Sequence, residues 1–176
     1  MQDFKTQLAL RDLAIAGHDW LHAVYMPVGS ADELSWYLNA NHQLTKVLRG
    51  RKMATVKDLF DECAAALQFP SYFGENWAAF HECMTDLSWL QATSYVLIIT
   101  DASEFLVQED IGEIRHLVNV FKSIAESWSI VNHPGSTWNH SEVPFHVVLQ
   151  EEPDDTEALR RRLSAFDVAV KLLNRQ

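Results

Sequence analysis

The segment from Tyr95 to Thr100 (YVLIIT) constrains the fold of this chain more than any other part of it. Its apolar residues follow one another without the alternating polar positions of a half-exposed strand. A strand of this kind is covered on both faces, as in a parallel sheet between two layers of helices. We therefore expect an α/β protein with this strand near the middle of a small, mainly parallel sheet.

Other strands and helices alternate along the chain around this segment, which favours crossover connections and a parallel sheet. The sheet is expected to have three to four strands packed with helices, in one domain of 176 residues. Further strands are predicted at His22 to Val28, Leu44 to Leu48 and Phe145 to Leu149. Helices are predicted from Ser30 (capped with Glu33), from Thr55 (with Asp58), from Asp110 to Trp128 and from Asp154 to Leu173.

Charge and composition limit the function. The formal net charge of −10 opposes direct binding to nucleic acid and favours a basic partner. There is no recognisable secretion signal and no apolar run of the roughly 20 residues that span a bilayer, so we expect a cytoplasmic protein that does not enter membranes. Cys63 and Cys83 fall on apolar helix faces and are expected to be reduced core residues.

The stretch from Phe69 to Leu90 predicts a helix with two different faces, opening at Gly74-Glu75-Asn76 and ending near Thr85 or Leu87. The apolar face collects Trp77, Phe80, Cys83, Met84 and Leu87. The opposite face collects Gly74, Ala78, His81, Glu82 and Thr85, with Asp86 at its edge. Periodicity alone leaves open that this polar face is only solvated. Tyr72 and Phe73 precede the helix, and we expect them to be exposed beside Glu82, as in a binding hot spot.

This stretch resembles the Barstar family of ribonuclease inhibitors. The resemblance rests on Pro70, the run Tyr72-Phe73-Gly74-Glu75-Asn76, Trp77 and Glu82, followed by the YVLII strand. It implies a core over residues 44–150, an N-terminal extension over 1–43 with a strand and a helix, and a C-terminal helix over 151–176. It also implies that the protein is not an enzyme, has no cofactor, and blocks a basic ribonuclease or toxin, as immunity proteins and antitoxins do. The contact residues that it implies are Tyr72, Phe73, Gly74, Asn76, Trp77, Ala78, His81, Glu82 and Thr85, to which we add Asp86.

Three positions depart from the pattern of that family. Ala78 stands where an acid is expected one turn before the key carboxylate, and that carboxylate is Glu82 instead of the usual Asp. A third acid expected on the long helix falls near Ser123. These departures leave a second hypothesis open: a non-catalytic interaction module with a partner that is not a nuclease. The sequence leaves the oligomeric state undetermined.

The histidines support a third hypothesis, a metal site or a hydrolase. His18 and His22 have a spacing that places two ligands on one helix face, and His133, His140 and His146 cluster around a predicted loop. Chance pairs are common among eight histidines, and loop histidines are usually solvated, so we expect no metal. The run Arg160 to Arg162 is expected to be a solvated helix patch.

Overall fold

A computed structural model describes residues 9–17, 19–130, 142–164, 166 and 168–174. Among these residues the chain forms one sheet of five strands in the order β2-β3-β4-β1-β5. Every neighbouring pair is parallel. The strands are β1 (Leu21–Tyr25), β2 (Leu44–Arg49), β3 (Tyr95–Thr100), β4 (Phe145–Glu151) and β5 (Lys171–Leu172). The predicted α/β class and parallel sheet are confirmed, with five strands where three to four were expected.

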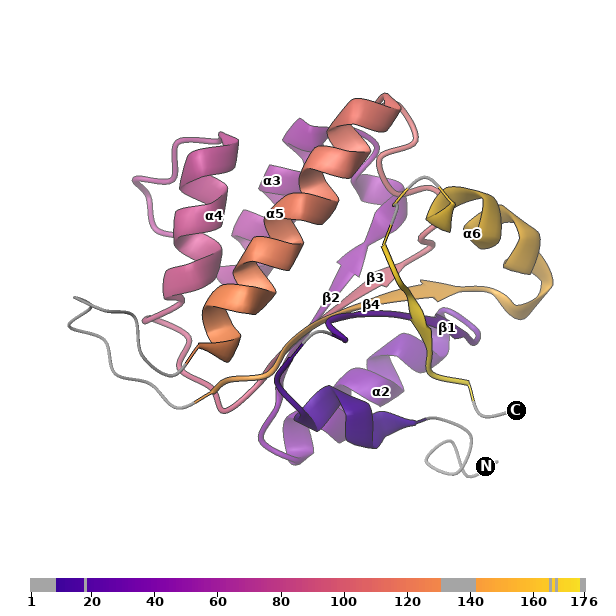
Figure 1. Cartoon of the computed structure of the whole chain (residues 1–176), viewed down its shortest axis with the longest axis horizontal. Helices are drawn as coiled ribbons and strands as arrows, with labels where there is room; N and C mark the ends of the chain where they lie inside the picture. Colours follow the sequence, from indigo (N-terminus) through magenta and orange to yellow (C-terminus); the bar gives the residue numbers. More distant parts are fainter. Residues whose placement is uncertain (1–8, 18, 131–141, 165, 167, 175–176) are drawn as a thin grey trace.

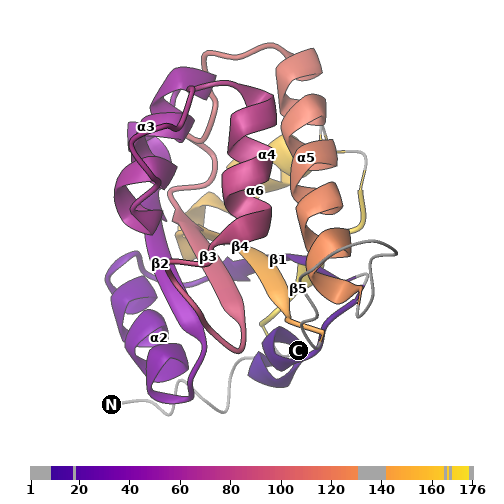
Figure 2. The same cartoon turned by 90° about the vertical axis from the view of Figure 1, so that its left-hand side faces the viewer.

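Helices cover both faces of the sheet. Figure 1 shows α3, α4 and α5 on one face and α2 on the other, and Figure 2 shows the same layers from the side. The α-helices are α2 (Gly29–Ala40), α3 (Val56–Leu67), α4 (Trp77–Asp86), α5 (Ile111–Ser129) and α6 (Thr156–Leu163). Short 3₁₀ helices are η1 (Leu10–Ala14), η2 (Gly50–Lys52) and η3 (Pro153–Asp155).

The β3 strand explains the unbroken apolar run, because all six of its residues are buried. Leu97 and Ile99 point into the larger core under α3, α4 and α5. Val96 and Ile98 point into the smaller core under α2 and η1. The centre of the five-stranded sheet is β4, and β3 is the interior strand next to it, so the predicted position near the middle of the sheet is confirmed.

The C-terminal prediction of one long helix is wrong. Helix α6 ends at Leu163, and the chain then returns to the sheet, where β5 pairs with β1. Leu163 and Phe166 pack on the larger core, whereas Leu173 is buried in the smaller core on the other side of the sheet. A single helix cannot bury side chains against both faces of a sheet, so this segment has to change direction.

The helix starts were predicted with mixed success. The Thr55 side chain accepts from the Asp58 amide and Asp58 bonds back, so this capping box is confirmed. The Ser30 and Glu33 box does not form: α2 begins at Gly29, and the Glu152 carboxylate accepts from the Val28 amide at 2.8 Å instead. A carboxylate from a distant segment supplies the acceptor that a local side chain was expected to supply.

Gly50 follows β2 and begins η2, at a point where two backbones come very close. A Cβ atom at this position would lie 2.2 Å from the carbonyl oxygen of Thr100 and 2.6 Å from that of Asp101. We expect Gly50→Ala to lower the free energy of unfolding by about 1–3 kcal/mol, because the backbone has to move apart. Urea denaturation measures this. The matched control is Gly29→Ala, whose Cβ meets nothing within 4 Å and which should leave stability unchanged or slightly higher. Equal effects of the two substitutions would contradict the close approach at Gly50.

Candidate protein-binding site

Helix α4 is fixed at its start by Asn76. The Asn76 side chain accepts from the Ala79 amide at 3.0 Å, which caps the helix, and its Nδ2 donates to the Gly74 carbonyl oxygen at 3.0 Å. The predicted opening at Gly74 to Asn76 is therefore the turn before the helix. Glu75 lies in this turn with φ of 47°, outside the helix.

The inward face of α4 is locked into the larger core. Phe80, Cys83, Met84 and Leu87 are buried, as their spacing predicts, and Trp77 is half-buried. The indole Nε1 of Trp128 on α5 donates to the Met84 carbonyl oxygen at 2.9 Å. Both cysteines are free and buried, and burial raises the pKa of each thiol. This packing holds α4 as a rigid platform for its outer face.

The outer face is open at some of its predicted positions and engaged at others. Gly74, Asn76, Ala78, Glu82 and Asp86 are exposed, whereas His81 and Thr85 are half-buried. The His81 Nε2 lies 2.9 Å from the Ser123 hydroxyl oxygen of α5, and the Thr85 hydroxyl donates to the His81 carbonyl oxygen at 2.8 Å. Ser123, the position of the missing acid, therefore contacts the site by bonding to His81.

The two aromatic residues before α4 have different surroundings. Tyr72 is 70% exposed, as predicted. Phe73 turns inward instead and packs edge-on against Phe60 and Phe69, with ring centroids 5.8 and 5.0 Å away. The turn in which the Phe73 amide donates to the Pro70 carbonyl oxygen directs this ring toward the core. The expectation that Phe73 is exposed beside Glu82 is therefore wrong.

The phenol of Tyr72 is close enough to the acids of α4 to be affected by their charge. Desolvation, followed by the nearby Cys83, Asp86 and Glu82, raises the pKa of the Tyr72 hydroxyl. Among the described residues, the ion pairs within 4.0 Å include neither Glu82 nor Asp86. Lys57 is bonded to Asp61 at 2.7 Å and Arg49 to Glu62 at 2.7 Å. We call Tyr72, Glu82 and Asp86 the acidic surface of α4, and its charge has no partner cation in the described chain.

One arrangement of histidines was not foreseen. His22 Nε2 and His146 Nδ1 lie 3.0 Å apart on the adjacent strands β1 and β4, with both side chains buried. His18, His133 and His140 lie outside the described residues, so the predicted His18–His22 and loop clusters are not described. No group of three or more His, Cys, Asp or Glu in the described part of the chain is placed to hold a metal ion. Finding the His22–His146 pair required the strand register, which sequence spacing does not give.

The arginine run is also only partly solvated. Arg160 and Arg161 each lie within 4.0 Å of the Glu157 carboxylate, at 3.6 and 3.7 Å, on the exposed side of α6. Arg162 turns inward, and its guanidinium donates to the Phe105 carbonyl oxygen, with Nε at 3.1 Å. Arg162 therefore ties α6 to the loop after β3.

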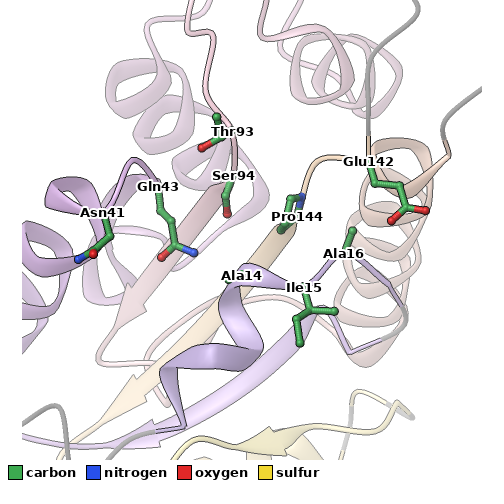
Figure 3. Close-up of a pocket in the computed structure, with 9 residues that line it drawn as sticks. All are labelled: Ala14, Ile15, Ala16, Asn41, Gln43, Thr93, Ser94, Glu142 and Pro144. Carbon is green, nitrogen blue, oxygen red and sulfur yellow. The ribbon is translucent and has the colours of Figure 1, made fainter.

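A pocket of about 500 Å³ opens at the amino ends of β2, β3 and β4, beside η1 (Figure 3). Gln43 Nε2 donates to the Leu13 carbonyl oxygen at 2.8 Å, and the Ser94 hydroxyl donates to the same oxygen at 3.4 Å. These polar groups are used to hold η1 in place. The pocket includes none of the predicted contact residues and is separate from the acidic surface of α4.

The fold and this surface define a class of protein: an α/β domain that presents a rigid acidic helix with an exposed tyrosine beside it. The family described as "Barstar (barnase inhibitor)" matches residues 43–150, more than half of the chain. The chain therefore belongs to the Barstar family.

Among the described residues, no helix is both long enough and apolar enough to cross a bilayer.

Other comparisons bear on the fold alone. A chain in the structure of Drosophila ORC bound to DNA is similar with a TM-score of 0.52 and 15% identity, over 90% of this chain and 27% of that one. A chain in the structure of Drosophila ORC bound to AT-rich DNA and Cdc6 gives a TM-score of 0.46 and 14% identity, over 89% of this chain and 48% of that one. This chain thus spans about half or less of these longer chains. No curated protein matches the sequence significantly.

Proposed function

We propose that this protein is an inhibitor that binds and occludes the active site of a ribonuclease or related toxin through α4 and the turn before it. The observation that carries the proposal is the acidic surface of α4, which has an exposed tyrosine and no partner cation within the described chain. Catalysis by this chain is not part of the mechanism. The biological role would be that of a cytoplasmic immunity protein or antitoxin.

The chemistry of a nuclease explains why such a surface would bind it. A ribonuclease cleft is basic because it holds the phosphates of RNA, and carboxylates can occupy the same positions. The net charge of −10 adds long-range attraction, which speeds encounter with a basic protein. The ring of Tyr72 would exclude water from the charge pairs that Glu82 and Asp86 form.

The proposed contact residues divide into two groups by their surroundings. Residues with exposed side chains or backbone would touch the partner directly: Tyr72, Gly74, Asn76, Ala78, Glu82 and Asp86. The remaining four are partly buried and would position the first group, with only their accessible edges in contact: Phe73, Trp77, His81 and Thr85. Gly74 and Ala78 add little bulk, so a partner backbone could approach the helix start closely.

Capturing the partner tests the proposal. The chain and its Glu82→Gln/Asp86→Asn variant are immobilised, bound proteins are recovered from the source cells, and RNA cleavage by each eluate is measured. We expect the wild type to retain a ribonuclease that the variant does not retain, and free wild-type chain to suppress its cleavage of RNA. The inhibitor proposal would be refuted if the wild type, but not the variant, retained only proteins without nuclease activity.

That outcome would support the second candidate, a regulatory or interaction module on the same scaffold. The observation that favours it is the loss of two acids from the family pattern, at Ala78 and near Ser123. Ser123 carries no charge, and its hydroxyl is engaged with His81. In this case the same α4 surface would bind a basic protein that is not a nuclease.

A further inference from the structure

Helix α2 carries a second exposed aromatic side chain, on the other side of the molecule from α4. Trp36 is 74% exposed, the largest exposed fraction among the big apolar side chains of the described residues. The opposite face of α2 is fully used, since Ala31, Leu34 and Leu38 are buried in the smaller core. Trp36 therefore contributes nothing evident to the packing of the helix, and an exposed tryptophan of this size is typical of a binding surface.

The charges around Trp36 favour one kind of partner. Asp32 and Glu33 lie four and three residues before Trp36, so they neighbour it on the surface of the helix, and both are exposed. Within the described chain, no ion pair within 4.0 Å involves either acid. The indole face is the best aromatic partner for an ammonium or guanidinium group. An indole beside two unpaired carboxylates is complementary to a cation on an extended or helical segment.

We propose that the outer face of α2, formed by Asp32, Glu33 and Trp36, docks a cationic segment of a partner protein, with an Arg or Lys side chain over the Trp36 indole. A second copy of this chain is disfavoured as the occupant, because it would bring the same acids together between two molecules that each carry −10. Nucleic acid and anionic lipid are opposed by the same charges.

This surface is independent of the proposed inhibitory site. Figures 1 and 2 show α2 and α4 on opposite faces of the sheet, so one compact partner cannot cover both. Residues 29–40 also lie outside the part of the chain that matches the Barstar family. The second surface would therefore let the protein hold a cationic segment while α4 is occupied.

The test uses a peptide of nine arginines as the probe and the indole N–H signals of the six tryptophans in a two-dimensional ¹H–¹⁵N NMR spectrum as the readout. The Trp36 signal is assigned by its absence in Trp36→Phe. The titration is repeated in a Glu82→Gln/Asp86→Asn background, which removes the α4 acids. We expect the Trp36 signal to shift with the peptide in both backgrounds, and the Asp32→Asn/Glu33→Gln variant to weaken this binding roughly fivefold or more.

The matched control is Asp154→Asn/Asp155→Asn, which removes the same number of charges from exposed positions of η3. We expect it to change the affinity less than twofold. The proposal is overturned if the Trp36 signal does not respond to the peptide, or if the control weakens binding as much as the α2 variant does. A Trp36 shift that depends on protein concentration without peptide would make a second copy the occupant, and a shift with anionic vesicles would make it a membrane. Either result also overturns the proposal.

Discussion

Lowering the pH from 7 to 4 is expected to reduce the free energy of unfolding by several kcal/mol through His22 and His146 alone. Burial is the main cause that lowers the pKa of each imidazole from 6.5 to about 4. A difference of one pKa unit between the folded and unfolded chain is worth about 1.4 kcal/mol. Each histidine is therefore expected to lower the free energy of unfolding by on the order of 3 kcal/mol at pH 4. The two rings are coupled, which makes the pair the titrating unit.

The direction follows from which state binds protons first. As the pH falls below about 6.5, the unfolded chain takes up protons on these histidines while the folded chain does not. The stabilisation that comes from keeping these two histidines neutral is therefore fully present above pH 6.5 and is lost progressively down to about pH 4. Asp12 and Asp19 favour the protonated form of both rings, and Lys171 opposes it at His22, but burial exceeds these effects.

A double-mutant cycle isolates this effect from the carboxylates that titrate in the same range. Among the described residues, His22 Nδ1 and His146 Nε2 have no hydrogen-bond partner within 3.5 Å, although backbone groups of Asp19 and Ile15 lie near enough to His146 to raise its pKa. His22→Val or His146→Val alone is expected to lower the free energy of unfolding by about 1–3 kcal/mol at pH 7.5. Each substitution leaves the facing nitrogen of the remaining histidine buried without its partner. The double variant should be near wild-type stability at pH 7.5 and should lose much less stability between pH 6.5 and 4.

Urea denaturation at a series of pH values measures both quantities. The same pH dependence in the double variant and in the wild type would show that the two histidines do not control acid stability. Additive single effects, with no recovery in the double variant, would show that the rings do not act as a pair.

The parts of the fold that follow from local patterns were predictable. The unbroken run in β3 gave a strand covered on both faces, and Thr55 with Asp58 located the start of α3. The errors came from contacts between distant segments. The α2 start is satisfied by Glu152, and the segment after Leu163 leaves the helix because β1 offers it an unpaired edge. Local spacing gives no information about either partner.

In the candidate site, too, features that follow from local spacing were predictable and features that depend on distant contacts were not. Helical periodicity separated the buried Phe80 and Met84 from the exposed Glu82 and Asp86. It could not show that Phe73 turns toward Phe60, because that depends on the turn at Pro70 and on packing against another helix. The exposure of Trp36 likewise depends on how α2 meets the sheet, which local spacing does not give.

Replacing Glu82 by Gln is expected to weaken binding to the captured ribonuclease about 10- to 150-fold. A hydrogen bond to a charged group is worth about 1.5–3 kcal/mol net, and the amide keeps the shape of the carboxylate without its charge. Glu82 is exposed, so the free energy of unfolding should change by no more than about 0.5 kcal/mol. Binding kinetics at several salt concentrations provide the measurement, and the wild type should show the steeper fall in association rate with salt.

The control for net charge is Asp154→Asn, which removes one exposed carboxylate far from α4 along the chain. A general attraction between an acidic and a basic protein would make both substitutions act alike, mainly on the association rate. A charge pair buried under Tyr72 would instead make Glu82→Gln raise the dissociation rate, and Tyr72→Ala would then reduce the effect of the Glu82 substitution, because water would reach the pair. Unchanged affinity of Glu82→Gln would remove this carboxylate from the mechanism and leave Asp86 and the aromatic contacts to carry binding.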